Sequence, residues 1–216
     1  MPAAKKIKLE SPRLATVEQM LDLPEYITDR AFFEYGVVEN CTIDGQQAYK
    51  VRFDQIIFRN VVFSNISFTG IELTDVLFDH CDLSNADFSD AIIHRTVFHS
   101  CKMIGIQLPG STLRNIRMEQ CLMDYANFRF ANAKQMILQE CQLNRSDFSN
   151  AVLKQMDFIQ LDMDQSSWSN TPLNGIDLSS CQFYGLIVNP EDLKGCTIAR
   201  EQAYLFAALF GLRLKD

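Results

Sequence analysis

The sequence predicts an all-β solenoid of four-sided coils that ends in an α-helix. Three features predict it: an uninterrupted five-residue hydrophobic repeat over residues 51–188, cysteines spaced by multiples of twenty, and an apolar segment after the repeat. We expect three regions: an N-terminal tail and short cap at 1–30, a β-helix at 31–198, and a C-terminal helix and tail at 199–216.

The repeat defines which side chains face inward. In residues 51–188 every residue whose number ends in 3 or 8 is apolar, and a mostly smaller residue stands two positions before it. These 28 pairs contain no charged residue, Asn, Gln, Gly or Pro. Two inward positions around one outward position are strand alternation, and the next two residues break it, so the chain must turn there. A helix cannot keep a period of five on one side. The short faces therefore wind into a solenoid.

The cysteines indicate the size of one coil. Six of the seven are separated by multiples of twenty residues, which places them in one column of a four-faced coil: Cys41, Cys81, Cys101, Cys121, Cys141 and Cys181. A second column predicts a core of Phe68, Phe88, Phe128, Phe148 and Trp168. The odd count and the absence of a signal-peptide pattern favour reduced, buried thiols in a cytoplasmic protein. No CxxC spacing supports zinc.

The region before residue 51 follows the repeat imperfectly. Thr16 is a candidate N-cap of a short helix through Leu23, with Gln19 placed for a capping box. Residues 31–50 predict a loose first coil, because Gly36 and Gln46 stand in inward positions. We expect the helix to cover this coil.

Inside the repeat, Ala133 is a small residue in a large position. Phe130 or Met136 is expected to fill the gap that it leaves, and the sequence does not distinguish them.

A C-terminal helix is predicted from Ala199 to Phe210, with Thr197 as a possible cap and Gly211 after its end. Its apolar residues run nearly all the way round, so more than one side has to be buried. One side can close the solenoid, and the other can meet the same helix of a second copy across a two-fold axis. The alternative is a monomeric end cap folded under residues 212–214.

Catalytic chemistry is not indicated. The chain has no Gly-rich phosphate loop, GxSxG or HExxH motif. His94 and His99 occupy the same outward position on adjacent faces, and His80 precedes Cys81, but the thiols are expected to point inward, where they are inert. We therefore expect no enzyme, no cofactor and no metal. The net charge of -7 argues against direct nucleic-acid binding, and no apolar run is long enough to span a membrane.

The acidic residues fall in two runs that contain no Lys or Arg. Residues 60–94 hold Glu72, Asp75, Asp79, Asp82, Asp87 and Asp90. Residues 155–193 hold Asp157, Asp162, Asp164, Asp177, Glu191 and Asp192. A dimer joined through the C-terminal helices would bring two copies of the second run to its centre, and a narrow negative rod suits a groove built for a DNA duplex. The alternative is an ordinary solvated surface.

The repeat resembles the pentapeptide-repeat family, in which a small residue, Asp or Asn, then Leu or Phe are followed by two polar residues. Residues 81–88 and 125–132 follow this pattern. The uninterrupted register and the ending at 201–212 are similar to the Qnr quinolone-resistance proteins, especially loop-free relatives in Gram-positive bacteria. The resemblance implies a right-handed quadrilateral β-helix that dimerises through C-terminal helices and binds DNA gyrase and topoisomerase IV as a DNA mimic.

Carried onto this chain, the resemblance assigns the acidic residues of both runs except Glu191 to the topoisomerase-binding surface, with Asp157, Asp162, Asp164 and Asp177 near the dimer centre. It assigns the dimer contact to Tyr204, Leu205, Ala208, Leu209 and Leu212. The chain lacks the loops that project from many Qnr proteins and contribute to protection, so binding is expected more firmly than protection. A structural solenoid that binds another cytosolic protein is the alternative.

Overall fold

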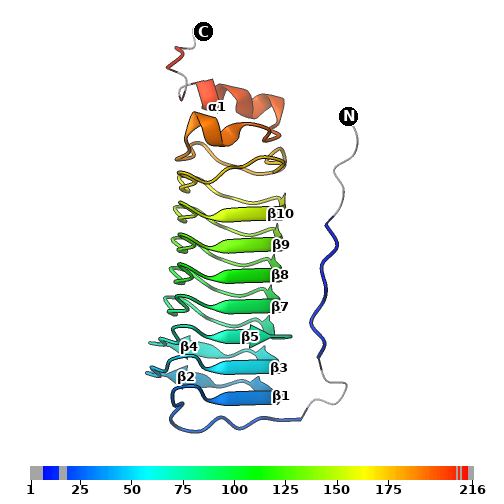
Figure 1. Cartoon of the computed structure of the whole chain (residues 1–216), viewed down its shortest axis with the longest axis vertical. Helices are drawn as coiled ribbons and strands as arrows, with labels where there is room; N and C mark the ends of the chain where they lie inside the picture. The colour runs from blue at the N-terminus through cyan, green and yellow to red at the C-terminus, as the bar shows by residue number, and fades with distance from the viewer. Residues whose placement is uncertain (1–6, 15–18, 208, 210, 214–216) are drawn as a thin grey trace.

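The computed structural model describes residues 7–14, 19–207, 209 and 211–213 of the 216-residue chain. The molecule is a rod of stacked coils with helical turns at the C-terminal end, and an N-terminal segment runs along its side (Figure 1). The main parallel sheet contains β1 (Phe32–Glu39), β3 (Arg52–Arg59), β5 (Glu72–Thr74), β6 (Leu77–Asp79), β7 (Ile92–His99), β8 (Thr112–Glu119), β9 (Asn132–Gln139) and β10 (Val152–Ile159). A second sheet pairs β2 (Thr42–Asp44) with β4 (Val62–Ser64).

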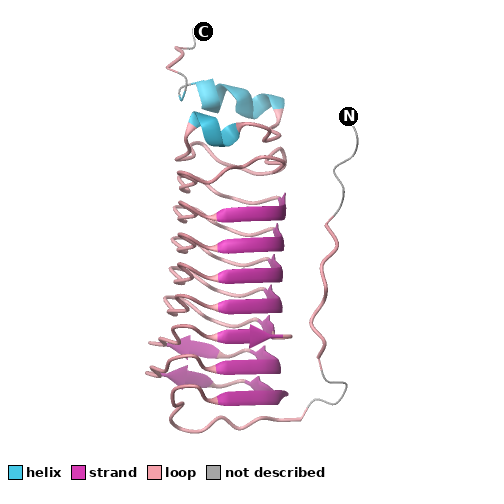
Figure 2. Cartoon of the chain, viewed as in Figure 1, coloured by secondary structure: helices cyan, strands magenta, loops and turns pink. Residues whose placement is uncertain are grey.

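The strand register confirms the twenty-residue coil. Phe53 pairs with Phe33 on one side and with Leu73 on the other. The same offset continues through isolated bridges as far as Asp177 and Thr197. Every strand pair is parallel because the chain returns to the same face after one full coil, and the strands and loops therefore stack in columns (Figure 2).

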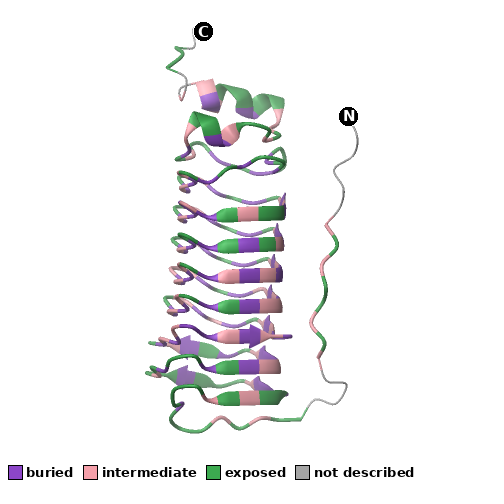
Figure 3. Ribbon diagram, in the orientation of Figure 1, coloured by how far each residue is buried: buried purple, intermediate pink, exposed green. Residues whose placement is uncertain are grey.

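The inward positions form one continuous core. All 56 residues of the 28 pairs in 51–188 are buried, except Leu153 and Leu186, which are half-buried and pack against the core. In Figure 3 the buried segments alternate with exposed ones along each coil. Aromatic rings stack between coils: the centroids of Phe128 and Phe148 are 4.5 Å apart, and those of Phe148 and Trp168 are 4.3 Å apart. Phe68 and Phe88 stack in the same way.

The corners are built on left-handed residues. Positions whose numbers end in 0 or 5 have positive φ almost throughout the coils, as at Asn65 (53°) and Asp75 (55°). Gly110 follows Pro109 at such a corner with φ 68°. Asn, Asp and Gly tolerate this conformation best, whereas other residues lose about 1 kcal/mol or more in it. The corner positions are therefore conformationally constrained whatever side chain they carry.

The predicted N-terminal helix is wrong in the part that can be assessed. Thr16 lies outside the described residues, but Gln19–Leu23 is extended and pairs with β1: the amide of Leu21 donates to the carbonyl of Val37 (2.8 Å). An extended segment supplies hydrogen-bonding groups to the open edge of the first coil, which a helix could not do.

Gly36 and Gln46, the two residues that depart from the repeat in the first coil, both contact the extended N-terminal segment. A Cβ at Gly36 would lie 2.7 Å from the Cβ of Leu21, so the close approach requires glycine. The Gln46 side chain accepts from the amide of Ile27 (2.9 Å) and donates to the carbonyl of Glu25 (3.0 Å).

At the C-terminal end the helix predicted over 199–210 is helical from Arg200 to Ala207 and at Leu209, whereas Ala208 and Phe210 lie outside the described residues. The helical structure at this end comprises the 3-10 turns η1 (Pro190–Leu193) and η2 (Arg200–Gln202), followed by α1 (Ala203–Ala207). Thr197 is not its cap, because it still forms a β-bridge with Asp177. The Gln202 side chain instead accepts from the amide of Ala199 (2.8 Å) and donates to the carbonyls of two residues in the last coil. The last coil thus fixes where the helix begins.

Ala133 is buried, and of its two candidate neighbours Met136 is buried as well. Phe130 is 59% exposed and does not fill the gap. It occupies a corner position with φ 59°, which directs its side chain outward.

Candidate protein-binding surface

The structure distributes the predicted acidic residues over all four faces of the rod. The column of Asp82 and Asp162 and the column of Asp87 lie on two of them. Glu72 and Asp157 lie on the two faces formed by the main sheet, in β5 and β10. The two acidic runs therefore do not form a single negative face.

Most acidic residues of the first run are engaged by neighbours. Glu72 binds Arg52 (2.9 Å), Asp82 binds Lys102 (3.1 Å), and Asp87 accepts from Ser67 (3.0 Å). Each of these partners lies one coil away, at a distance of twenty residues in the sequence. A search for opposite charges at that spacing would have found the ion pairs, which the one-dimensional charge count missed. Asp90 is exposed.

Asp75 is the most deeply buried carboxylate of this run, at 3% exposure. Arg95 donates to both of its oxygens, from Nε (2.6 Å) and from Nη2 (2.7 Å), and the backbone amide of Arg13 donates as well (2.9 Å). Burial pushes the pKa of Asp75 up, but the hydrogen bonds from Arg95 and Arg13 outweigh it, and the pKa lies below its ordinary value. Asp75 is thus an ionised structural anchor.

Two of the three histidines lie together at the surface. His80, not His94, lies beside His99, and both rings hydrogen-bond to the same oxygen of Asp79, at 2.8 and 2.9 Å. One ligand atom from each of these three residues lies within 4.8 Å of the others, so the group has the donor set of a surface transition-metal site. Burial raises the pKa of Asp79, but the two histidines lower it by more. His94 contacts Arg95 instead.

The second acidic run is more accessible. Asp162 and Asp177 are exposed and Asp157 is half-buried. Asp164 accepts from the amides of Tyr184 and Gly185 (2.9 Å each), which lowers the pKa of its carboxyl. Asp192 is buried at 9% exposure and binds Asn189 (2.8 Å), so it is not available to a partner in this arrangement.

The C-terminal helix has one packed side and one open side. Phe206 is buried against Phe183, with ring centroids 5.7 Å apart. Tyr204 and Leu212 are exposed at 56% and 62%, respectively. Of the other predicted dimer residues, Leu205 and Leu209 are half-buried on the core, and Ala208 lies outside the described residues.

The cysteine column is a structural element. Cys81, Cys101, Cys121 and Cys141 are buried, and each thiol donates to the backbone carbonyl twenty-three residues earlier, at 3.4–3.5 Å. Burial also raises the pKa of Cys181, and it raises that of Cys196 to about 11. Cys181 and Cys196 are therefore protonated at neutral pH.

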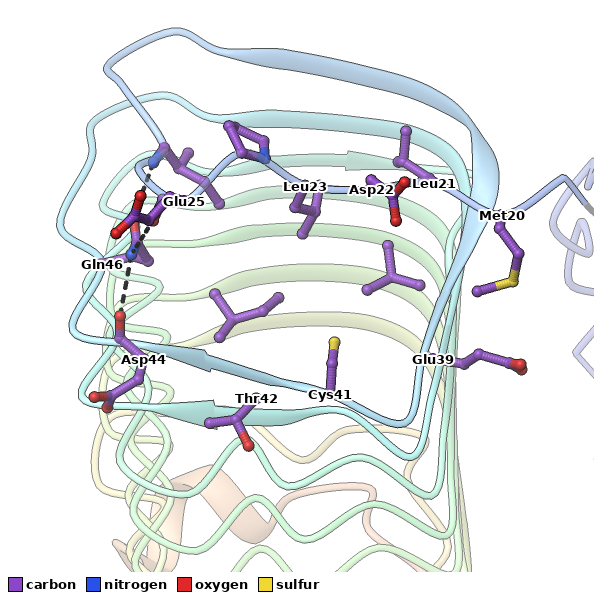
Figure 4. A pocket seen from close by; sticks show the side chains of 14 residues that line it. Met20, Leu21, Asp22, Leu23, Glu25, Glu39, Cys41, Thr42, Asp44 and Gln46 are labelled. Carbon is purple, nitrogen blue, oxygen red and sulfur yellow. Dashed lines mark hydrogen bonds between the residues drawn. The ribbon is translucent and has the colours of Figure 1, made fainter.

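Cys41 departs from the prediction of buried thiols, because it is exposed. The extended N-terminal cap covers the first coil incompletely and leaves a pocket of about 460 Å³ lined by Met20–Glu25, Ile27, Val38, Glu39, Cys41–Asp44 and Gln46. Figure 4 shows the thiol of Cys41 pointing into this pocket. The remaining burial still raises the pKa of Cys41.

None of the helices in the part of the chain that the structure describes has the length and hydropathy needed to cross a membrane. The fold and its surface define a parallel β-solenoid whose interior is filled by side chains and whose outward polar residues stack in columns. This architecture is suited to presenting side chains to a macromolecular partner.

The model of the pentapeptide repeat region matches residues 71–148 and 91–168. The uncharacterised protein YisX of Bacillus subtilis (strain 168) is 43% identical over 206 residues, which cover 95% of this chain and 97% of that protein. The chain belongs to the pentapeptide-repeat family.

One solved pentapeptide-repeat structure is similar in fold. HetL, a pentapeptide-repeat protein involved in heterocyst differentiation regulation in the cyanobacterium Nostoc sp. strain PCC 7120, is 17% identical with a TM-score of 0.50, over 79% of this chain and 84% of HetL. A trypsin-treated form of QnrB1, a plasmid-mediated fluoroquinolone resistance protein, is 17% identical with a TM-score of 0.43, over 88% of this chain and 100% of that one.

Proposed function

We propose that the chain is a non-enzymatic, cytoplasmic DNA mimic that binds type II topoisomerases, either DNA gyrase or topoisomerase IV or both. Binding at the surface that receives DNA would protect these enzymes from quinolones or modulate their activity. The proposal starts from the likeness of the repeat and of residues 201–212 to the Qnr proteins.

The observation that carries the proposal is the charge of the last coils. Residues 155–193 contain six acidic residues and no Lys or Arg. Asp162 and Asp177 are exposed, and the pKa of Asp164 is lowered by the backbone amide of Tyr184, so the region presents fixed negative charge on a narrow rod. DNA is itself a rod with about one negative charge per 1.7 Å of its axis.

A homodimer would complete the mimic. The exposed Tyr204 and Leu212 leave an apolar surface at the end of the rod next to these coils. A second copy that covers this surface would double the length of the rod and place both acidic regions at its centre. Aromatic residues such as tyrosine are enriched in interfaces of this kind.

A second candidate function is a scaffold that binds another cytosolic protein. The pairing of Glu72, Asp75 and Asp82 with basic residues favours it, because these carboxylates are already engaged within the rod. In that case the acidic charge of the last coils would not matter for function.

A supercoiling assay distinguishes the two functions. DNA gyrase and topoisomerase IV are assayed with and without a quinolone at micromolar concentrations of the purified chain. The proposal predicts inhibition, or relief of quinolone inhibition, and loss of this effect in the double variant Asp162→Lys/Asp177→Lys. The matched control Asp22→Lys/Glu25→Lys makes the same change in charge at exposed positions near the opposite end and is expected to retain it. No effect of the wild-type chain on either enzyme would exclude the topoisomerase proposal.

A further inference from the structure

The N-terminal segment, residues 7–14, lies along the rod instead of extending from its end. In Figure 1 it runs parallel to the long axis beside the stack of strands. Hydrogen bonds join it to residues 62–150 positions away in the sequence. The prediction of an N-terminal tail and short cap at 1–30 did not include this tertiary contact of residues 7–14.

One corner column of the rod and one neighbouring residue, Asp157, make these contacts. The amides of Ile7, Glu10 and Arg13 donate to the side chains of Asp157 (3.3 Å), Asn115 (3.1 Å) and Asp75 (2.9 Å). Between them, the Gln135 side chain donates to the carbonyl of Lys8 (3.4 Å), and the Arg95 guanidinium lies 4.0 Å from the carboxylate of Glu10. We call the corner column of Asp75, Arg95, Asn115 and Gln135, together with Asp157 on the adjoining face of the next coil, the axial groove.

The rise of the extended segment matches the spacing of the coils that it contacts. From Ile7 to Arg13 an extended chain advances about 20 Å, at about 3.3 Å per residue. The coil of Asp157 lies four coils from the coil of Asp75, which is about 19 Å at about 4.8 Å per coil. Because these two lengths agree, the segment meets a new polar side chain at each coil without bending.

Most of these hydrogen bonds go to the backbone of the segment, so they recognise an extended conformation and not particular side chains. Apolar side chains supply the sequence preference: Ile7, Leu9, Pro12 and Leu14 are half-buried, whereas Lys8, Glu10, Ser11 and Arg13 are exposed. The half-buried positions are i, i+2, i+5 and i+7, which is the spacing of the inward positions in the coils themselves.

Two of the acceptors are strongly fixed. Asn115 and Asp75 are 7% and 3% exposed, and Asp75 is held by Arg95. These exposures are those of the occupied groove, in which the amides of Glu10 and Arg13 satisfy both acceptors, so an occupant that offers backbone amides leaves no buried acceptor unpaired. Next to Ile7 the surface is hollowed by about 610 Å³ between Gln135, Leu153, Gln155, Met156 and residues 174–176. The groove therefore extends at least one coil beyond its described occupant.

We propose that the axial groove is a binding site for an extended peptide with apolar side chains at positions i, i+2, i+5 and i+7, and that residues 7–14 occupy it within the same chain. A peptide of this chemistry from another molecule binds when it replaces the segment. A tethered segment has an effective concentration in the millimolar range, so the wild-type chain excludes weak competitors. This site goes beyond the proposed topoisomerase function and does not depend on it.

The test uses the full-length chain with its own segment weakened. Leu9→Asp places a charge at a half-buried position of the segment and leaves the rod unchanged. A fluorescent synthetic peptide with the sequence of residues 5–16 is titrated with each protein and its anisotropy is measured. The proposal predicts saturable binding to Leu9→Asp that is at least about tenfold tighter than binding to the wild-type chain, because the competing segment is displaced.

A matched pair of rod variants locates the site. Asn115→Gly, added to Leu9→Asp, removes the side-chain acceptor at a corner whose φ of 54° suits glycine, and should weaken peptide binding about fivefold or more. Asn85→Gly makes the same change at another corner with φ 58° and should leave binding unchanged. Circular dichroism verifies that each variant is folded. No binding to Leu9→Asp, equal binding to the wild-type chain, or an equal effect of the two glycine variants would overturn the proposal.

Discussion

The carboxylate of Asp75 and the guanidinium of Arg95 form a two-pronged ion pair between adjacent coils, with N–O distances of 2.6 and 2.7 Å. Both side chains are largely buried, at 5% and 12% exposure. The pair lies at a left-handed corner and accepts the backbone of the N-terminal segment through Asp75. One contact thus joins coil stacking, corner geometry and the axial groove.

Arg95→Met should destabilise the rod by about 3 kcal/mol, because it leaves the buried carboxylate of Asp75 without its partner. Urea unfolding followed by circular dichroism measures the loss. The control is Arg145→Met, at a corner of the same conformation whose side chain lies at the surface, bonded to Gln165 (3.1 Å). Its cost should stay below about 1 kcal/mol. Equal losses would mean that burial of the pair is unimportant.

The same pair predicts a dependence of stability on pH. The pKa of Asp75 is lower in the folded chain than its ordinary value of 3.8, since Arg95 and Arg13 outweigh the effect of burial. A lowered folded pKa gives stability that is fully present above the unfolded pKa and is lost as the pH falls through the folded pKa. The free energy of unfolding that Asp75 contributes should therefore be constant from pH 7 to about 5 and fall below about pH 4. Asp75→Asn should flatten this part of the profile, and a profile as steep as that of the wild type would contradict the assignment.

Phe128→Asp should prevent folding, because Phe128 is 1% exposed and stacks on Phe148. An unpaired buried charge costs more than about 4 kcal/mol, a large share of the stability of a domain. Phe130→Asp is the matched control: Phe130 is 59% exposed in a left-handed conformation that Asp tolerates well. Thermal unfolding of both variants, with the control close to wild type, checks the inward register.

Cys41 should be the first cysteine to react with iodoacetamide in the folded chain, since it is exposed while Cys81, Cys101, Cys121 and Cys141 are buried. Its rate should rise with pH across the mildly alkaline range, because the thiolate is the reactive form and burial raises the pKa of Cys41. Mass spectrometry of the labelled protein identifies the site. Rapid native labelling of the four column cysteines would show that the coils open.

Tyr204→Asp should convert the proposed dimer to a monomer, because it places a charge on the open side of α1, where Tyr204 is 56% exposed. Light scattering after size-exclusion chromatography measures the mass. Tyr26→Asp introduces the same charge at a 73% exposed tyrosine near the other end of the chain and should leave the mass unchanged. A wild-type chain that is monomeric at micromolar concentration would refute the dimer.

The sequence predicted the coil because the constraint is local and repeated. An inward position such as that of Phe128 must hold an apolar residue in every coil, so the repeat can be recognised in the sequence. The ends were predicted less well, because each end depends on what it covers. Gln19–Leu23 is extended since the edge of β1 offers hydrogen bonds, and Thr197 stays in the solenoid since Asp177 pairs with it.

By itself the sequence determined the solenoid, its twenty-residue coil and its core, because a strict alternation of apolar and polar positions allows only one set of side chains to leave water. Tertiary structure decided which charges remain free. Whether Asp75 is a surface carboxylate or a buried anchor depends on Arg95 one coil away and on Arg13 from the N-terminal segment. The pair with Arg95 follows the twenty-residue spacing of the coils, but the contact with Arg13, 62 residues away, follows no repeat, so the charge pattern of the sequence could not reveal it.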